Sequence, residues 1–159
     1  MTNSNENKFI IVHLWGNHQP YNNFDEDDQN ELPQAEEYDW TIHHTDRVLS
    51  SLIETIEENN QPYTLIYTSD HGEIVNKGHG FEKGREQYFV PFLFKSNNYN
   101  CQFIENFRND DGWISGLMNK YILSMLLGFK VDPQIIEQQK AHDRILDANE
   151  DVVLFSQVE

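Results

Sequence analysis

The sequence has one cysteine and no long apolar run. Because Cys101 is the single thiol in 159 residues, an intrachain disulfide framework and a cysteine-rich zinc module are excluded. We expect this thiol to be buried or half-buried. No apolar stretch reaches the roughly 18 residues of a membrane span, and residues 1–8 lack the apolar core of a signal peptide. The sequence therefore predicts neither a membrane segment nor an export signal, and it assigns no compartment.

Basic residues are also scarce. Eleven Lys and Arg stand against 27 Asp and Glu, giving a net charge of −16, which argues against binding the phosphate backbone of nucleic acid. Ten Phe, seven Tyr and three Trp are more aromatic residues than a disordered acidic tail would carry. We expect a folded acidic domain, or part of a larger one, that does not bind nucleic acid.

Strand and helix patterns alternate along the chain and predict an α/β fold. Apolar runs at 9–15, 63–68 and 90–95 are typical of strands, and the first has the continuous pattern of a strand buried on both faces of a parallel sheet. Residues 35–59 are predicted to be helical, because apolar side chains recur there at steps of three and four. Strand, helix and strand in this order indicate a right-handed βαβ unit.

The rest of the chain gives shorter signals. A second helix is predicted from 113 to 127, with Asp110 and Asp111 ahead of it and Gly128 as its terminating glycine. A shorter helix follows Pro133, and residues 152–155 fit either a strand or a tail. The segment 17–34 is predicted to be a surface loop, and its acidic cluster at 25–31 lacks the ligand spacing of a calcium loop.

Candidate functional residues gather where strands should end. Asp70 and His71 follow the run at 63–68, and a carboxylate beside an imidazole suits a divalent metal. The alternative is an aspartate that caps the next turn beside a surface histidine. His18 follows the first run, and His79 lies between two glycines. In a parallel sheet His18, His71 and His79 would share one edge, where ligands bind.

The remaining histidines divide into two groups. His13 lies within the first apolar run. His43 and His44 in the long helix, and His142 near the end, are expected to be solvated. No nucleophile elbow, phosphate-binding loop or dinucleotide fingerprint is present.

Residues 67–73, with the sequence Y-T-S-D-H-G-E, resemble a signature of sulfatase-like enzymes in the alkaline phosphatase superfamily. Within this superfamily, the branch that the chain resembles most is the bacterial phosphoethanolamine transferases. The chain resembles the C-terminal half of their catalytic domain. Three further blocks follow the order of that branch: they are residues 13–21, residues 38–46, and His79-Gly80 with Val90-Pro91-Phe92. Residues 126–129 resemble its last helix, and Trp40 departs from its usual asparagine.

The resemblance implies an alkaline phosphatase-like α/β fold, a three-layer sandwich with a mostly parallel sheet. Residues 9–130 would form the C-terminal half of the catalytic domain, after a disordered start at 1–8. Residues 131–159 would add a helix and a strand or tail. Because the missing strands would leave a sheet edge exposed, association through that edge is expected.

The resemblance also implies an activity. A zinc-dependent enzyme would move phosphoethanolamine from a phospholipid donor to lipid A or another envelope glycan, on the periplasmic side of the inner membrane. Asp70 and His71 would be zinc ligands, while His18 and His79 would contact the phosphoryl group, with His13 a weaker candidate. The family's nucleophilic threonine and a further acidic ligand would come from upstream, so this chain alone is expected to be inactive.

Two alternatives stay open at this point. Phosphoglycerol transferases and sulfatases share the Asp-His block, so the chain could be part of either. It could also be a non-catalytic domain that kept the fold and binds a basic partner through the acidic residues of segment 22–37.

Overall fold

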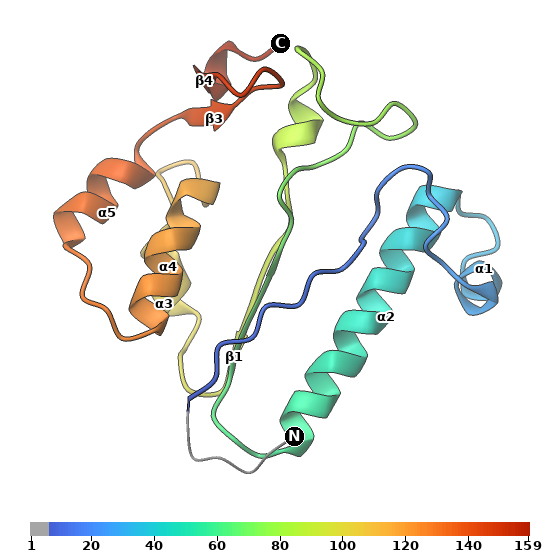
Figure 1. Ribbon diagram of the computed structural model, residues 1–159, viewed down its shortest axis with the longest axis horizontal. Helices are drawn as coiled ribbons and strands as arrows, with labels where there is room; N and C mark the ends of the chain where they lie inside the picture. The colour runs from blue at the N-terminus through green and yellow to red at the C-terminus, as the bar shows by residue number, and fades with distance from the viewer. Residues whose placement is uncertain (1–6) are drawn as a thin grey trace. The chain divides into compact units, whose positions relative to one another are not determined.

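The computed structural model describes residues 7–159 and divides into two compact units, Met1–Thr55 and Ile56–Glu159 (Figure 1). Six residues of the predicted disordered start, 1–6, lie outside the described residues. Within the part that is described, no helix combines the length and the apolar character that crossing a bilayer requires.

The first unit is organised by a long helix. α2 spans Glu37–Glu58, which confirms the helix predicted at 35–59. Its buried residues are Thr41, Thr45 and Leu49, four residues apart and therefore on one face. Ile42, which the apolar pattern placed on the buried face, is 43% exposed. The two threonines are buried because both hydroxyls have partners: Thr41 donates to the carbonyl of Tyr38, and Thr45 to Asn17 Oδ1.

The acidic segment before α2 is folded, which corrects the prediction of a solvated loop. Residues Glu26–Glu31 form α1. Asp25 caps this helix, since its side chain accepts hydrogen bonds from the amides of Asp27 and Asp28. Asp28 in turn accepts from the Asp25 amide at 2.9 Å, completing a capping box. The capping box explains why the acidic residues begin a helix.

Asp28 is fully buried, and four donors surround its carboxylate. Besides the Asp25 amide, these are His43 Nδ1 at 2.7 Å, His44 Nδ1 at 2.9 Å and Arg47 Nη1 at 2.9 Å. Burial acts to raise the pKa of Asp28, but these hydrogen bonds together hold it well below its ordinary value. The prediction that His43 and His44 are solvated is therefore wrong: both are half-buried and bind the carboxylate.

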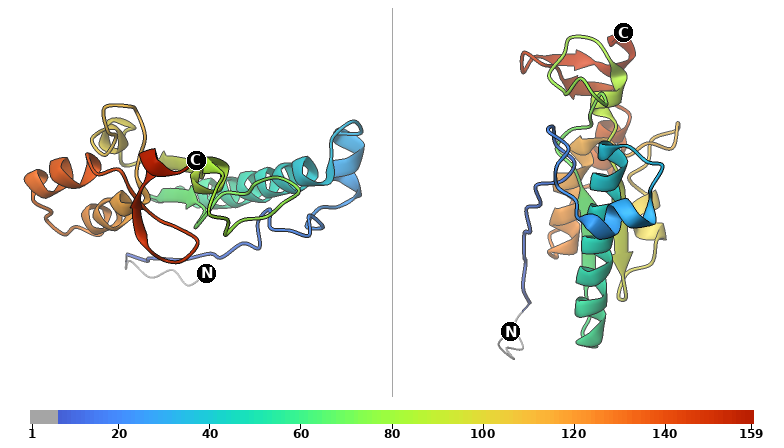
Figure 2. Two further views of the ribbon diagram at one scale, coloured as in Figure 1. Left: turned by 90° about the horizontal axis from the view of Figure 1, so that it is seen from above. Right: turned by 90° about the vertical axis from the view of Figure 1, so that its right-hand side faces the viewer.

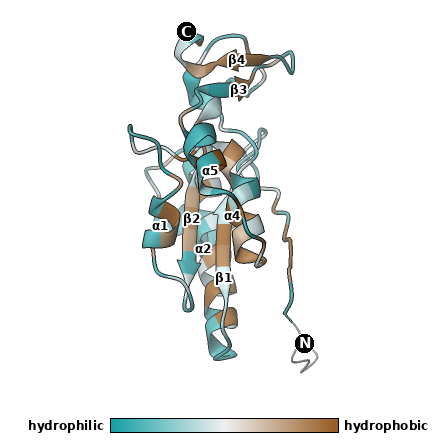
Figure 3. Cartoon of the chain, turned by 90° about the vertical axis from the view of Figure 1, so that its left-hand side faces the viewer, coloured by the Kyte–Doolittle hydropathy of each residue, from teal (hydrophilic) through white to brown (hydrophobic). Residues whose placement is uncertain are grey.

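The predicted first strand does not form. Residues 9–15 are mostly apolar, as their colour in Figure 3 shows, but they have no strand partner. Most of their apolar side chains are exposed, with Ile10 at 68% and Ile11 at 80%. An extended segment becomes a strand only when a neighbour satisfies its backbone N–H and C=O groups. Among the described residues, no strand pairs with this segment.

The second unit contains the main sheet, and its strands are antiparallel. β1, Thr64–Thr68, pairs with β2, Phe92–Ser96, with Thr68 opposite Phe92 and Thr64 opposite Ser96. The predicted parallel order is wrong for this pair. The connection is long enough for a parallel crossover, which is usually an α-helix, but it does not fold as one. The connection from 69 to 91 holds only a short 3-10 helix, η1, Arg85–Tyr88. It reverses the chain, so that β2 runs beside β1 in the opposite direction. The chain is α/β in content, and no third strand joins this pair within the described residues. Association through its edges stays a prediction.

One face of this sheet is covered by helices (Figure 1). These are α3, Gln102–Glu105; α4, Asn119–Leu126, preceded by the 3-10 helix η2, Gly116–Met118; and α5, Pro133–Lys140. The buried residues of these helices and of the turn after α3 pack against Ile66, Phe92 and Phe94 of the sheet; they are Ile104, Phe107, Met118, Ile122 and Ile136. This cluster is the hydrophobic core of the unit.

The two helices predicted here are confirmed, with shifted starts. α4 with η2 begins at 116 rather than 113, and Ser115 rather than Asp110 or Asp111 provides the cap. Gly128 ends α4 with φ of 86°; its amide donates to Met125 and the amide of Phe129 to Ser124, as in a Schellman motif. Asp132 caps α5, with Pro133 at its first position. His142 is exposed as predicted, whereas Cys101 is exposed rather than buried.

The chain ends in a small hairpin beside the connection between β1 and β2 (Figure 2). β3, Arg144–Leu146, pairs with β4, Val152–Leu154, so the last apolar run is a strand. The 3-10 helix η3, Phe155–Gln157, follows. Arg85 of the connection donates to the carbonyl of Val158 at 2.9 Å and stacks over the ring of Phe155.

Asp28→Asn tests the first unit's charge cluster. The variant keeps the shape of the side chain but leaves the guanidinium of Arg47 without its buried anion. We therefore expect the free energy of unfolding in urea to fall by about 2–3 kcal/mol. Asp27→Asn is the matched control, because Asp27 meets Arg47 only at the surface, at 3.3 Å. It should change stability by no more than about 0.5 kcal/mol. Equal effects of the two variants would contradict the assignment.

Acid should remove the same stabilisation. Because the pKa of Asp28 is lower in the folded chain than its ordinary 3.8, the unfolded chain takes up a proton more readily once the pH falls below about 4. Stability from this group is fully present above that pH and is lost as the pH falls further. Thermal unfolding followed by circular dichroism should show the wild type losing more stability than Asp28→Asn between pH 5 and pH 2. Parallel curves would refute this origin.

Candidate metal site

The functional motif lies immediately beyond β1, in the second unit. Ser69 is the first residue after the strand, and its hydroxyl lies 2.9 Å from the carbonyl of His71 and 3.2 Å from Asp70 Oδ1. Gly72 follows, and its amide donates to the carbonyl of Gln87 at 2.8 Å. A Cβ at Gly72 would stand 2.4 Å from the carbonyl oxygens of Glu86 and Phe89. Only glycine fits this close approach.

A tight turn then reverses the chain. The amides and carbonyls of Ile74 and Gly78 exchange hydrogen bonds at 2.9 and 3.0 Å, and the turn between them uses positive φ at Asn76 and Gly78. Asparagine and glycine tolerate this conformation best. In an antiparallel pairing the next two residues outward are Glu73 and His79, so the turn brings their side chains together.

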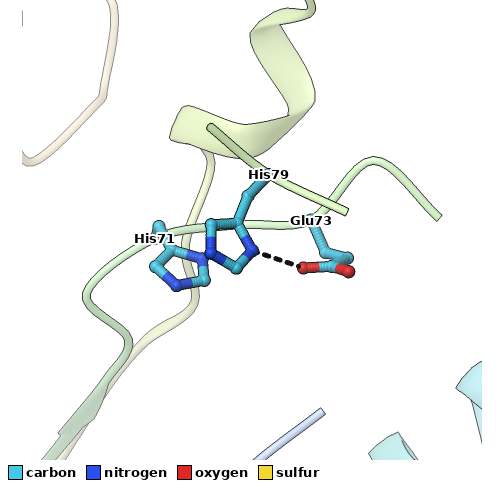
Figure 4. Close-up of side chains that lie close together, drawn as sticks. All are labelled: His71, Glu73 and His79. Atoms are coloured by element: carbon cyan, nitrogen blue, oxygen red, sulfur yellow. Dashed lines mark hydrogen bonds and ion pairs between the residues drawn. The ribbon is translucent and has the colours of Figure 1, made fainter. Parts of the chain in front are cut away.

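His71, Glu73 and His79 form one group (Figure 4). Each offers a possible metal-binding atom, and these atoms lie within 4.8 Å of one another. The two imidazole rings are stacked, with centroids 3.7 Å apart. Glu73 Oε2 lies 3.2 Å from His79 Nδ1, and the Glu73 side chain is only 7% exposed. A carboxylate this buried requires a positive or hydrogen-bonding neighbour.

The hydrogen bonds indicate which ring nitrogen of His71 and of His79 carries a proton. His71 Nδ1 lies 2.9 Å from the carbonyl of Gly72, and His79 Nδ1 faces the carboxylate of Glu73. Both oxygens can only accept, so each Nδ1 carries a proton. In a neutral ring Nε2 then has the free lone pair. A metal-binding histidine usually binds the metal through one nitrogen and donates a hydrogen bond from the other to a carbonyl or carboxylate oxygen.

Asp70 lies beside this group rather than in it. Its carboxylate oxygen Oδ2 is 3.8 Å from His71 Nε2, and its side chain is 86% exposed. Partial desolvation by the atoms around it acts to raise the pKa of Asp70, but the nearby His71 imidazole, the backbone amides and the Ser69 hydroxyl outweigh that effect and lower it. Asp70 is therefore ionised near neutral pH, which is the form that binds a metal.

The other two predicted residues, His13 and His18, belong to the first unit. His18 is exposed and has ring contacts with Trp15, whose centroid is 6.0 Å away. His13 lines an open hollow of about 220 Å³ together with Trp15 and His44. The contact of His13 and His18 with a phosphoryl group stays a prediction.

Glu73 is the site residue that the sequence analysis missed, although it stands in the quoted motif. The sequence could have indicated Glu73 by its spacing to His79. Between them lie Asn76-Lys77-Gly78, three residues that favour a turn reversing the chain. The resulting donor set is two imidazole nitrogens and one carboxylate oxygen, with a second carboxylate at its side. These are the ligand types that zinc prefers, in the number that a catalytic zinc site requires.

Comparison with known proteins agrees with this chemistry. The family model described as Sulfatase matches residues 1–119. The chain is 33% identical over 123 residues to the phosphoethanolamine transferase EptA of Helicobacter pylori, covering 59% of this chain and 22% of that protein. It is 30% identical over 121 residues to the phosphatidylethanolamine transferase Mcr-2 of Escherichia coli, covering 60% and 22%.

A longer match is found with the protein YhbX of Escherichia coli, at 27% identity over 167 residues, covering 94% of this chain and 30% of that protein. The chain therefore spans less than a third of the length of these curated relatives. No solved structure matches it. Since the family model covers three quarters of the sequence, the chain belongs to the sulfatase family, with relatives among the phosphoethanolamine transferases.

Proposed function

We propose that this chain supplies a zinc-binding part of a phosphoethanolamine transferase. The observation that carries the proposal is the group of His71, Glu73 and His79, whose metal-binding atoms lie within 4.8 Å of one another. The names of two relatives support the transferred group. The donor would be a phospholipid and the acceptor lipid A or another envelope glycan, on the periplasmic side of the inner membrane.

His71 is the central ligand in this proposal. Its Nε2 faces Asp70 Oδ2 at 3.8 Å on one side, and its ring stacks on His79 on the other. Two ligands of one zinc ion, each about 2 Å from the metal, can stand this far apart. Asp70 and His71 would bind as the resemblance implies, and His79 would either join them or contact the phosphoryl group. Glu73 would be a further ligand or would orient His79 through its Nδ1 proton.

The chain's net negative charge favours a bound cation wherever an anionic substrate is to bind. A phospholipid phosphodiester is anionic, and a chain of net charge −16 repels it. A bound zinc ion would neutralise charge on the phosphoryl oxygens and lower the pKa of a coordinated hydroxyl. With a second proton on its Nε2, His79 would donate a hydrogen bond or that proton to the same oxygens. The role of His18 and, less strongly, His13 toward the phosphoryl group is carried by the resemblance alone. No residue of the chain has been matched to the family's nucleophile, so turnover by these 159 residues alone is not expected.

The charge cluster involves part of the acidic surface in the alternative of a non-catalytic domain. Asp25, Asp27 and Asp28 all pair with Arg47, but this one guanidinium offsets only one of the seven acidic residues of segment 22–37.

Zinc binding by the purified chain tests the ligands. We expect one zinc ion with a Kd of about 1 µM or tighter, measured by calorimetry and elemental analysis. His71→Ala should abolish binding, and Asp70→Ala and His79→Ala should each weaken it at least about tenfold. His142→Ala is the control, because this exposed histidine lies outside the group, and it should bind as the wild type does. Full binding by His71→Ala would disprove the proposed centre.

Transfer activity tests the reaction in the complete protein. With fluorescent phosphatidylethanolamine as donor and lipid A as acceptor, His71→Ala should reduce transfer by about a hundredfold or more. A chelator should have the same effect, and added zinc should reverse it. His142→Ala should retain activity. Transfer that survives both the chelator and His71→Ala would rule out the zinc-dependent reaction.

A further inference from the structure

A buried glutamine organises the loop that carries the metal-binding group. Gln87 lies in η1 and is 4% exposed. Its side-chain Oε1 accepts hydrogen bonds from the amides of Gly80 at 2.8 Å and Phe81 at 3.0 Å. Its Nε2 donates toward the carbonyls of Phe81, Lys83 and Gly84 at 2.8, 3.3 and 3.0 Å. This uses the full bonding capacity of a primary amide.

The backbone of the same residue holds the other end of the loop. Its carbonyl accepts from the amide of Gly72 at 2.8 Å, at the point where Gly72 is too close to the carbonyls of Glu86 and Phe89 for any side chain. Gly72 directly follows His71, and Gly80 directly follows His79. Gln87 therefore fixes the backbone immediately after each of the two histidines, although its side chain is bonded to neither ring.

We propose that Gln87 is a positioning residue for the group of His71, Glu73 and His79. This proposal rests on the function proposed above. The loop contains Gly78, Gly80 and Gly84, all with positive φ, and so has much conformational freedom to lose. A single buried amide that bonds five backbone groups removes that freedom. It would hold the stacked rings 3.7 Å apart before a metal arrives, and pre-organised ligands bind more tightly.

Gln87→Met and Gln87→Glu separate positioning from general stability. Methionine keeps the length of the side chain and loses every hydrogen bond. Glutamate keeps the acceptor for Gly80 and Phe81 but turns an oxygen toward three carbonyls. Gln139→Met is the matched control, because Gln139 also makes a side-chain hydrogen bond within this unit, to Arg144 at 2.9 Å, outside the loop.

Three measurements are made on the 159-residue chain: zinc affinity, the visible absorption spectrum of bound Co²⁺, and amide hydrogen exchange without metal. We expect Gln87→Met to weaken zinc binding about 10- to 100-fold, change the Co²⁺ spectrum and speed exchange at Gly80 and Phe81. Gln87→Glu should show changes at least as large, because its second carboxylate oxygen faces three carbonyl oxygens. If one of the two variants does not fold, the other decides the question. Gln139→Met should match the wild type in all three.

The outcomes distinguish this proposal from the proposed function. If exchange at Gly80 and Phe81 rises while zinc affinity and the Co²⁺ spectrum stay as in the wild type, Gln87 only stabilises the loop and its positioning role is overturned. If the wild type itself binds neither metal, the proposed function fails, and the positioning role fails with it.

Discussion

The antiparallel pairing of β1 with β2 is the constraint on which the second unit depends. Because Thr68 stands opposite Phe92, the chain must leave and return at the same end of the sheet, and everything between them forms a closed loop. The inner face of the pair, with Ile66, Phe92 and Phe94, also provides the surface on which the helices bury their apolar residues. One pairing thus places both the core and the loop of the metal-binding group.

Closure of the loop at its base does not by itself order its interior. That order comes from hydrogen bonds to main-chain groups: the exchange between Ile74 and Gly78 and the contacts of Gln87. Both rely on glycine, either for positive φ or for close approach of the backbone at Gly72. The ligand side chains stand next to these fixed points, so their placement follows from backbone geometry more than from contacts among the side chains themselves.

The first unit depends on hydrogen bonds to one buried charged group. A chain with 27 acidic residues concentrates part of that charge around one buried carboxylate, Asp28, and surrounds it with Arg47, His43 and His44. A buried carboxylate is tolerable only with such donors. The same side chain completes the capping box of α1. Asp28 therefore joins the first turn of α1 to the residues of α2 that bind its carboxylate.

Local signals in the sequence determined local structure. The apolar period predicted α2, Gly128 and Pro133 marked helix ends, and the Y-T-S-D-H-G-E run pointed to His71 and the family. Strand order, the exposure of residues 9–15, the pairing of His43 and His44 with Asp28, and the meeting of Glu73 with His79 were decided only by the tertiary structure. The physical reason is that propensity and periodicity act over a few residues. Pairing direction and burial depend on partners that the local sequence does not name. Here the connection from 69 to 91 forms no crossover helix and brings β2 back antiparallel to β1.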